Sequence, residues 1–324
     1  MRFGPARCYA AVLLASLTGA PVGMAQTFPE EGRTITLMVP YAAGGTVDGT
    51  ARLMASGLEE ELGTTVQVVN KPGAASQVAM ATLLQAEPDG YTLSYAVLPT
   101  VITHYMDPER AAPYIREDFQ KIGLHFAVPA LLAVNTDSPY QSVTDLLAAA
   151  RENPGGIKVS DSGLMATPHM QLLMLELAED VKFAAVHFDG GAPSVTALLG
   201  GHVDVLAGSI GDAVPNVKAG NFRVLGIADT EPSPYLPDVP TMAAQGIDVV
   251  TYSATGMIGP AGMLEEVVKA LSEAVEKVIA SDAHQERLTQ YGVTSRYLGP
   301  DAYDAFWVDY EGRIGPVIEA VRAN

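Results

Sequence analysis

A glycine-rich loop near the N-terminus has the residue types of an anion-binding turn. The segment Pro40–Arg52, PYAAGGTVDGTAR, follows the apolar run TITLMV and opens a segment with helical spacing. Gly44 and Gly45 allow a ligand to approach the backbone, and the free N–H groups at a helix start attract negative charge. Thr46 offers a hydroxyl, and Asp48 can cap the helix. A plain packing turn would use the same residues, so the loop alone leaves both interpretations open.

The sequence argues against a nucleotide-binding site and against a metal site. A Walker loop needs Gly-Lys-Ser/Thr, which does not follow these glycines, and the three-glycine spacing of a dinucleotide-binding turn is also absent. The six histidines do not form a metal-ligand spacing such as H-E-x-x-H. We therefore expect no nucleotide, no other cofactor and no metal ion.

A second loop repeats this design further along the chain. The segment Ser160–Met170, SDSGLMATPHM, follows a strand-like run and precedes a helical one. Thr167 is a candidate N-cap, and Pro168 suits the first helical position. His169 is either a packed core residue or a ligand contact. A nucleophilic pair of Ser162 and His169 is conceivable, but the G-x-S-x-G elbow is missing, because AGSIG begins with Ala207.

A third stretch, residues 187–209, combines two Gly-Gly turns with a helix between them. Asp189 and Gly190 precede this helix, and Gly200 with Gly201 follow it as a C-cap and turn. The Asp189 carboxylate can either cap the helix or meet a hydroxyl or amino group of a ligand. The sequence does not decide between these roles.

Strand-like and helix-like runs alternate along the chain and must position these loops. From residue 34 to residue 98 the rhythm is strand, helix, strand, helix, strand, which predicts a largely parallel sheet covered by helices. The rhythm restarts near residue 126 and predicts a second α/β lobe up to about residue 229, with a helix capped by Ser142. The C-terminal tail is helical and is expected to pack on the first lobe. Ligands of such sheets bind at the carboxyl ends of the strands, where all three loops lie.

Length, net charge and cysteine content restrict the kind of protein that this chain can be. The chain has 324 residues, which suits two domains, and a net charge of −18, which argues against a nucleic-acid partner. Residues 1–25 have a basic start, a short apolar core and small residues at positions 23 and 25, the pattern of a secretory signal peptide. Cys8, the one cysteine, lies within this segment, so the exported chain would lack disulfides and thiol chemistry.

Five ordered motifs together resemble one known family. They are VPYAAGGTVDGTARLMASGLEEELGTTVQVVNKPGAASQVA, AEPDGYTL, GGAPSVTALLGGHVDVL, VKAGNFRVLGIA and LPDVPTMAAQGI. From about residue 30 to the C-terminus the chain is similar to the substrate-binding proteins of tripartite tricarboxylate transporters, the TctC or Bug family. The resemblance implies a two-lobed α/β periplasmic binding protein of type II, a Venus flytrap without enzymatic activity. Its expected divisions are a signal peptide at 1–25, a first lobe at 26–127 and 230–324, and a second lobe at 128–229, with hinges near 126–129 and 228–231.

The same resemblance implies ligand, partner and location. Family ligands are mostly small organic acids, including di- and tricarboxylates, aromatic carboxylates and acidic amino acids. A two-subunit membrane permease receives them from the binding protein in the periplasm of a Gram-negative cell. Independently of the resemblance, we expect a monomer. Two alternatives remain: a ligand-sensing partner of a membrane kinase, which would use the same closed state, and a secreted hydrolase using Ser162 or Ser209.

The candidate ligand-binding residues come from the three loops. The first loop is expected to supply Tyr41 as a wall, Ala43, Gly44, Gly45 and Thr46 for backbone contacts, and Asp48 to fix the loop. Opposite them we place Ser160, Ser162, Gly163, Thr167 and His169, with Asp189 and Gly190 beside them. The chain departs from the family at Asp161, Leu164 and Met165, at Asp189, where a basic residue is usual, and at the small residues Ser253 and Ala254. We therefore hypothesise that Asp189 recognises an amino or hydroxyl group of the ligand.

Overall fold

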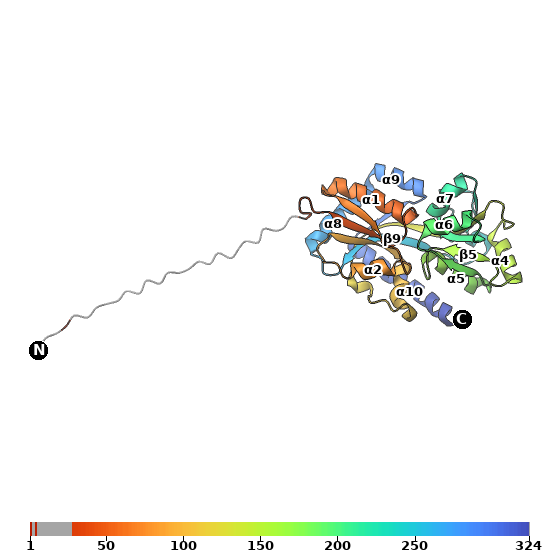
Figure 1. Ribbon diagram of the computed structural model, residues 1–324, viewed down its shortest axis with the longest axis horizontal. Coiled ribbons are helices and arrows are strands. Elements are labelled where there is room, and N and C mark those ends of the chain that lie inside the picture. The colour runs from red at the N-terminus through yellow and green to blue at the C-terminus, as the bar shows by residue number, and fades with distance from the viewer. Residues whose placement is uncertain (2–3, 5–27, 324) are drawn as a thin grey trace.

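The computed structural model describes residues 1, 4 and 28–323. The predicted signal peptide therefore lies almost entirely outside the described residues. Figure 1 shows two lobes side by side along the long axis, with α1, α2, α8 and α9 around one and α4, α5, α6 and α7 around the other. Among the described helices, none combines the length and the apolar character needed to cross a membrane.

The first lobe contains the predicted alternation of strands and helices together with the C-terminal helices. Its helix α1 presents Met54, Ala55 and Leu58 to the core and ends at Gly63, which has a φ of +64°. The N-terminal elements are β1 (Ile35–Val39), α1 (Thr46–Leu62), β2 (Val66–Asn70), α2 (Gln77–Leu83), β3 (Thr92–Leu98), α3 (Thr100–Met106), η1 (Pro108–Arg110) and η2 (Arg116–Asp118). The C-terminal elements are β9 (Tyr252–Pro260), α8 (Glu265–Ala280), α9 (Asp282–Leu288), η4 (Thr289–Tyr291), β10 (Ser295–Leu298) and α10 (Pro300–Ala323).

The second lobe repeats the alternation. Its first helix starts at the predicted cap, since the Ser142 hydroxyl accepts a hydrogen bond of 3.0 Å from the Asp145 N–H. The elements are α4 (Val143–Glu152), β5 (Lys158–Asp161), α5 (Thr167–Glu179), β6 (Ala184–His187), α6 (Gly191–Leu199), β7 (Val205–Ser209), α7 (Ile210–Lys218), β8 (Phe222–Ile227) and η3 (Ala243–Gln245).

One long strand joins the two lobes. Strand β4 (Phe119–Asn135) pairs antiparallel with β9 over Phe119–Pro129, and with β7 and β8 from Ala130 onward. The main path through the sheet is β2-β1-β3-β9-β4-β7-β5-β6, and β8 and β10 also pair with β4. The pairs among β1, β2 and β3 and among β5, β6 and β7 are parallel, which brings the carboxyl ends of these strands toward the junction of the lobes.

The return crossing lies beside β4. The Thr251 carbonyl accepts from the Ala130 N–H at 3.0 Å, and the Thr251 N–H donates to the Ala228 carbonyl at 3.1 Å. Residues beyond the expected boundary at 229 pack with the second lobe, because Met242 and Val249 belong to the same apolar cluster as Val143, Leu147 and Leu225. We therefore propose that the second lobe extends to about residue 250 and that the return hinge is at Thr251.

Two predicted caps differ from those in the structure. Helix α5 begins at Thr167 with Ala166 as its N-cap, so the prediction that Thr167 is the cap is wrong. The Thr167 hydroxyl lies instead 3.5 Å from the Thr100 hydroxyl of the first lobe, which also accepts from the Thr167 N–H. Helix α1 has Gly45 as its N-cap, and Asp48 lies in its first turn.

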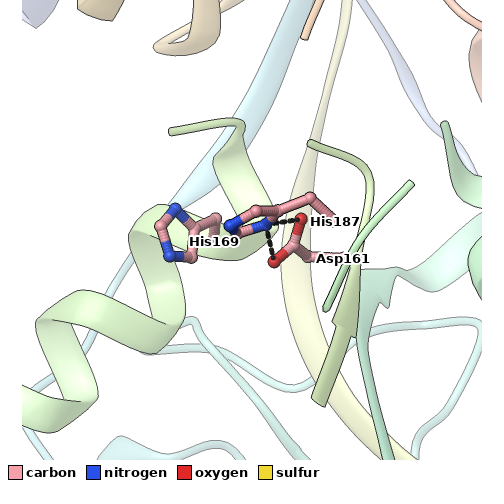
Figure 2. A group of neighbouring side chains, drawn as sticks. All are labelled: Asp161, His169 and His187. Atoms are coloured by element: carbon pink, nitrogen blue, oxygen red, sulfur yellow. Dashed lines mark hydrogen bonds and ion pairs between the residues drawn. The ribbon is translucent and has the colours of Figure 1, made fainter. Parts of the chain in front are cut away.

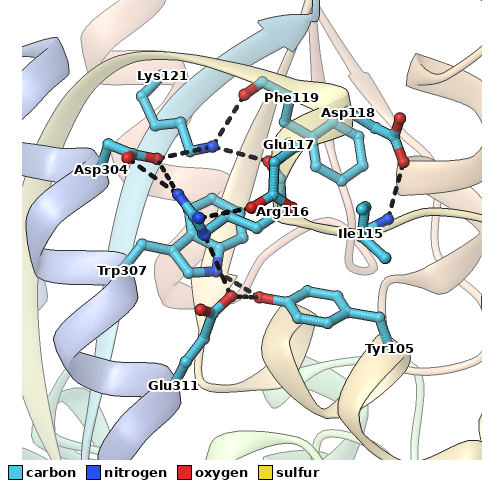
Figure 3. A network of polar contacts seen from close by, with 10 residues as sticks. All are labelled: Tyr105, Ile115, Arg116, Glu117, Asp118, Phe119, Lys121, Asp304, Trp307 and Glu311. Atoms are coloured by element: carbon cyan, nitrogen blue, oxygen red, sulfur yellow. Dashed lines mark hydrogen bonds and ion pairs between the residues drawn. The ribbon is translucent and has the colours of Figure 1, made fainter.

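A polar network fastens α10 to the first lobe (Figure 3). The buried Lys121 ammonium lies 3.0 Å from the Asp304 carboxylate and donates to the carbonyls of Arg116 and Phe119 at 2.7 and 3.0 Å. Arg116 reaches the same carboxylate at 2.8 Å. Burial lowers the pKa of Lys121, although the hydrogen bond and charge of Asp304 act in the opposite direction. The Asp304 carboxylate therefore compensates a charge that the fold has removed from water.

We expect Asp304→Asn to lower the free energy of unfolding by about 2 kcal/mol. Removing one partner of a fully buried ion pair costs roughly 3–5 kcal/mol, and the Asp304 side chain is 41% exposed, so the loss is smaller here. Urea unfolding at pH 7 measures the change. Asp301→Asn, an exposed carboxylate on the same helix, is the matched control. Equal midpoints for the two variants would show that Lys121 does not depend on Asp304.

Candidate functional site

The N-termini of four helices meet around a small cavity between the lobes. Helix α1 comes from the first lobe, whereas α5, α6 and α7 come from the second, and each follows the carboxyl end of a strand. The cavity has a volume of about 40 Å³, which is room for about three water molecules. It is lined by Tyr41, Ala42, Gly45, Thr46, Val47, Asp48, Val97, Phe126, Val128, Ser162, Thr167, Pro168, Gly191, Ser209, Asp212, Ser253 and Thr255. Helix N-termini carry partial positive charge and unpaired N–H groups, so this position favours an anion.

The first predicted loop contributes one wall of this cavity. The Asp48 carboxylate accepts from the Gly44 N–H at 2.9 Å and forms an ion pair with Arg52 at 2.9 Å, so it holds the loop against α1. Burial raises the pKa of Asp48, but the hydrogen bonds from Arg52, Gly44 and Asn70 outweigh it and leave the pKa below its usual value. Tyr41 is buried, and burial raises its pKa to about 12. Ala43 and Gly44 are exposed and do not line the cavity.

The second predicted loop contributes Ser162 and Thr167 to the opposite wall. Ser160 is buried behind them, where its hydroxyl donates to the Ser194 carbonyl at 3.3 Å. Gly163 has a φ of +138°, and a Cβ there would lie 2.7 Å from the Ala75 Cβ of the first lobe, so only glycine permits this close approach. Within the part of the chain that the structure describes, Ser162 has no hydrogen bond to a histidine, so the serine–histidine pair of a hydrolase is not assembled here.

Two residues of this loop, Asp161 and His169, form a cluster with His187 (Figure 2). The His187 Nδ1 lies 2.9 Å from both oxygens of Asp161, and the rings of His187 and His169 meet edge to face with centroids 4.6 Å apart. Burial raises the pKa of Asp161 although His187 and the Gly163 N–H lower it, and burial lowers the pKa of His169 to about 3.

These three side chains are close enough to be considered as metal ligands, since one donor atom from each lies within 4.8 Å of the others. However, the His169 Nδ1 accepts a hydrogen bond of 2.9 Å from the Met165 N–H. The proton of the neutral ring is then on Nε2, so His169 presents a hydrogen-bond donor and no free lone pair. The arrangement is a histidine hydrogen-bonded to a carboxylate beside a neutral histidine, and it is not a set of three free ligands.

The third predicted loop lies at the outer rim of the cleft. The Asp189 side chain is exposed and faces a second cavity of about 850 Å³, and its backbone carbonyl accepts a hydrogen bond of 2.8 Å from the Ala42 N–H across the lobes. Gly190 has a φ of +132° and packs on Tyr41. The outer cavity is lined by Ala42, Pro72, Ala74, Ala75, Gln77, Asp107, Glu109, Arg110, Gly163, Leu164, His187, Phe188, Asp189 and Pro193.

The sequence analysis missed two residues that connect the lobes. The Asp212 carboxylate of α7 accepts from the Thr46 hydroxyl at 2.8 Å and from the Thr46 N–H at 3.3 Å, and its other oxygen accepts from the Ser209 hydroxyl at 2.7 Å. The Ser-x-x-Asp pattern from Ser209 to Asp212 at a helix start was the available signal. Arg110 donates to the Leu164 carbonyl at 2.6 Å and to the Ala74 carbonyl at 2.7 Å, so it also bridges the lobes.

Comparison with known proteins agrees with this architecture. The model of the tripartite tricarboxylate transporter family receptor matches residues 50–322. A Pseudomonas protein described as the UPF0065 protein in the tcbD-tcbE intergenic region is 31% identical over 304 residues, which cover 92% of this chain and 89% of that protein. The structure of MatC from Rhodopseudomonas palustris with bound malate has a TM-score of 0.83 at 27% identity and covers 88% of this chain and 99% of that one.

A further R. palustris protein, solved with adipate, has a TM-score of 0.84 at 26% identity, covering 91% of this chain and 98% of that one. These likenesses confirm the expected two-lobed α/β fold of a periplasmic binding protein. They also agree with the five sequence motifs from which the resemblance was drawn. The chain belongs to the tripartite tricarboxylate transporter receptors, a family of periplasmic solute-binding proteins.

Proposed function

We propose that this protein captures a small carboxylated compound between its lobes in the periplasm and delivers it to a two-subunit membrane permease. The observation that carries this proposal is the convergence of four helix N-termini on one cavity. In the first turn of α1, the N–H groups of Val47 and Asp48 have no acceptor within the described residues, although both residues line the cavity. A carboxylate of the ligand would accept these hydrogen bonds.

The contacts between the lobes support a mechanism of closure. Thr46 with Asp212, Ala42 with Asp189, and Thr100 with Thr167 form hydrogen bonds only while the lobes touch. A cavity of about 40 Å³ is too small for an organic acid of several carbon atoms, so the ligand would enter when the lobes separate. Ligand binding then shifts the population toward a closed state, and the permease recognises the surface which that state presents.

The solved relatives bear on the ligand class. One of them was solved with malate and another with adipate, both of which are dicarboxylates. The net charge of −18 does not oppose such a ligand, because local N–H groups and dipoles decide the contact while net charge affects the encounter rate.

A panel of small acids tests the proposal. We expect one class among dicarboxylates, tricarboxylates, aromatic carboxylates, acidic amino acids and hydroxy acids to raise the thermal midpoint of the purified protein. A ligand at 100 times its dissociation constant stabilises by about 2.7 kcal/mol, which corresponds to roughly 5 °C at this size. Neutral amides of the same acids are the matched controls. A flat panel, together with no bound acid in native mass spectrometry of the purified protein, would contradict the proposal.

A further inference from the structure

The inner cavity has acidic side chains but no basic one. Asp48 and Asp212 line it, and no Lys, Arg or His is among the described residues that do so. A site built to bind a simple carboxylate gains nothing from a second carboxylate in its wall, because like charges repel strongly where water is excluded. The presence of two acids therefore says something about the ligand.

The two acids are compensated differently. Asp48 has an ion pair with Arg52 and accepts hydrogen bonds from Asn70 and Gly44, so its charge is balanced within the first lobe. Asp212 has no cationic partner among the described residues, and its hydrogen bonds come from Thr46 and from Ser209. Asp212 thus places a negative charge at the N-terminus of α1, beside the donors that a carboxylate of the ligand would use.

A second observation at this cavity indicates a polar group on the ligand. Thr255 of β9 lines the cavity and is fully buried, yet its hydroxyl has no hydrogen-bond partner within the described residues. A buried hydroxyl without a partner costs free energy, roughly 1–3 kcal/mol. Its position in the lining of the cavity means that a bound molecule can supply the missing partner.

We infer that Asp212 makes this cleft selective for organic acids that carry a hydroxyl or amino group next to a carboxylate. This inference rests on the proposed function. The carboxylate of such a ligand accepts from the N–H groups of Val47 and Asp48. Each oxygen of Asp212 already accepts two hydrogen bonds, so the neighbouring hydroxyl or ammonium donates to Asp212 in place of the Thr46 hydroxyl. The Thr255 hydroxyl pairs with the same end of the ligand. An acid without that donor brings its carboxylate against Asp212 with nothing between the two charges.

Matched pairs of acids test this selectivity by isothermal titration calorimetry. The pairs are malate with succinate, 2-hydroxyglutarate with glutarate, and lactate with propionate, and the amino acids aspartate and glutamate are titrated beside them. We expect the hydroxy or amino acid of a binding pair to bind about 10- to 100-fold more tightly than its unsubstituted partner, as for a hydrogen bond to a charged group. In Asp212→Asn the ratio of the two affinities within a pair is expected to fall toward one. The main reason is that the unsubstituted acid binds this variant more tightly than it binds the unmodified protein.

The control is Asp137→Asn, which removes an exposed acid from the second lobe and is expected to leave the ratio unchanged. Equal affinities within every pair that binds would overturn the inference and leave the proposed function standing. A ratio that Asp212→Asn does not change would overturn the role of Asp212. If none of these acids binds and the wider panel is flat, both proposals fail. The ratio of the unmodified protein tests the selectivity even if the variant does not fold.

Discussion

Between pH 7 and pH 4 the free energy of unfolding is expected to fall by about 5 kcal/mol or more. Burial is the main cause that lowers the pKa of His104 to about 3, with the charge of Arg110 adding to it, and it lowers the pKa of His169 to about 3 as well. Burial lowers the pKa of His284 to about 4. It also lowers the pKa of His125, against which His284 packs, well below its usual value. His104, His169 and His284 are therefore neutral in the folded protein at pH 5.

The direction of this pH dependence follows from the protons that the unfolded chain takes up. An unfolded histidine has a pKa of about 6.5, so below this pH the unfolded chain binds protons that the folded chain does not. The contribution of each buried neutral histidine to stability is therefore fully present above pH 6.5, and it is lost as the pH falls toward the pKa of the folded state. Each histidine with a folded pKa of about 3 lowers the free energy of unfolding by about 3 kcal/mol between pH 7 and pH 4. The raised pKa of Asp161 acts in the opposite direction, but one carboxyl group does not offset four histidines.

His104 provides the test of a single site. Its Nε2–H donates to the Ala75 carbonyl at 2.9 Å, and its Nδ1 accepts from the Tyr114 hydroxyl. Urea unfolding of His104→Gln at pH 7, 6, 5 and 4 is expected to show a loss of stability about 3 kcal/mol smaller than in the unmodified protein. His202→Gln, at an exposed histidine, is the matched control. Parallel curves for the protein and His104→Gln would refute the assignment.

Replacing Gly211 with alanine is expected to weaken ligand binding about 10- to 100-fold. A Cβ on Gly211 would lie 2.2 Å from the Tyr291 carbonyl oxygen and 2.6 Å from the Thr46 hydroxyl oxygen, and real Cβ atoms do not approach that closely. Both contacts are with elements of the first lobe, whereas Gly211 belongs to α7 of the second. Overpacking of this kind costs roughly 1–3 kcal/mol. Because alanine is a better helix former than glycine, α7 itself is not weakened by the change.

The expected consequence is a shift of α7 away from Thr46 that breaks the hydrogen bond to Asp212. Calorimetry with the acid that gives the largest thermal shift measures the affinity, and small-angle scattering measures the opening of the lobes without any ligand. Gly312→Ala is the control, because this helical glycine is exposed and has nothing within 4 Å of the position of its Cβ. Unchanged affinity and an unchanged radius of gyration would show that closure does not depend on this contact.

Local features of the fold were predictable from the sequence because they depend on neighbours in the chain. The alternation of apolar runs predicted the strands and helices, and the Ser142 cap is formed by a residue three positions away. The glycine-rich loop was placed correctly at a strand end that opens a helix, since the run from β1 to α1 is continuous. The five ordered motifs identified the family before any geometry was known.

Contacts between the lobes were not predictable in this way. Thr46 and Asp212 are separated by 166 positions in the sequence. Their hydrogen bond forms only because β4 joins the two lobes and the lobes meet at this point. The orientation of Asp189 was also undetermined: its backbone carbonyl, not its carboxylate, makes the contact with Ala42. By itself the sequence determined the elements, the helix starts at the strand ends and the family. Which acid faces the cleft was decided by tertiary structure, because that depends on how two separately folded lobes meet.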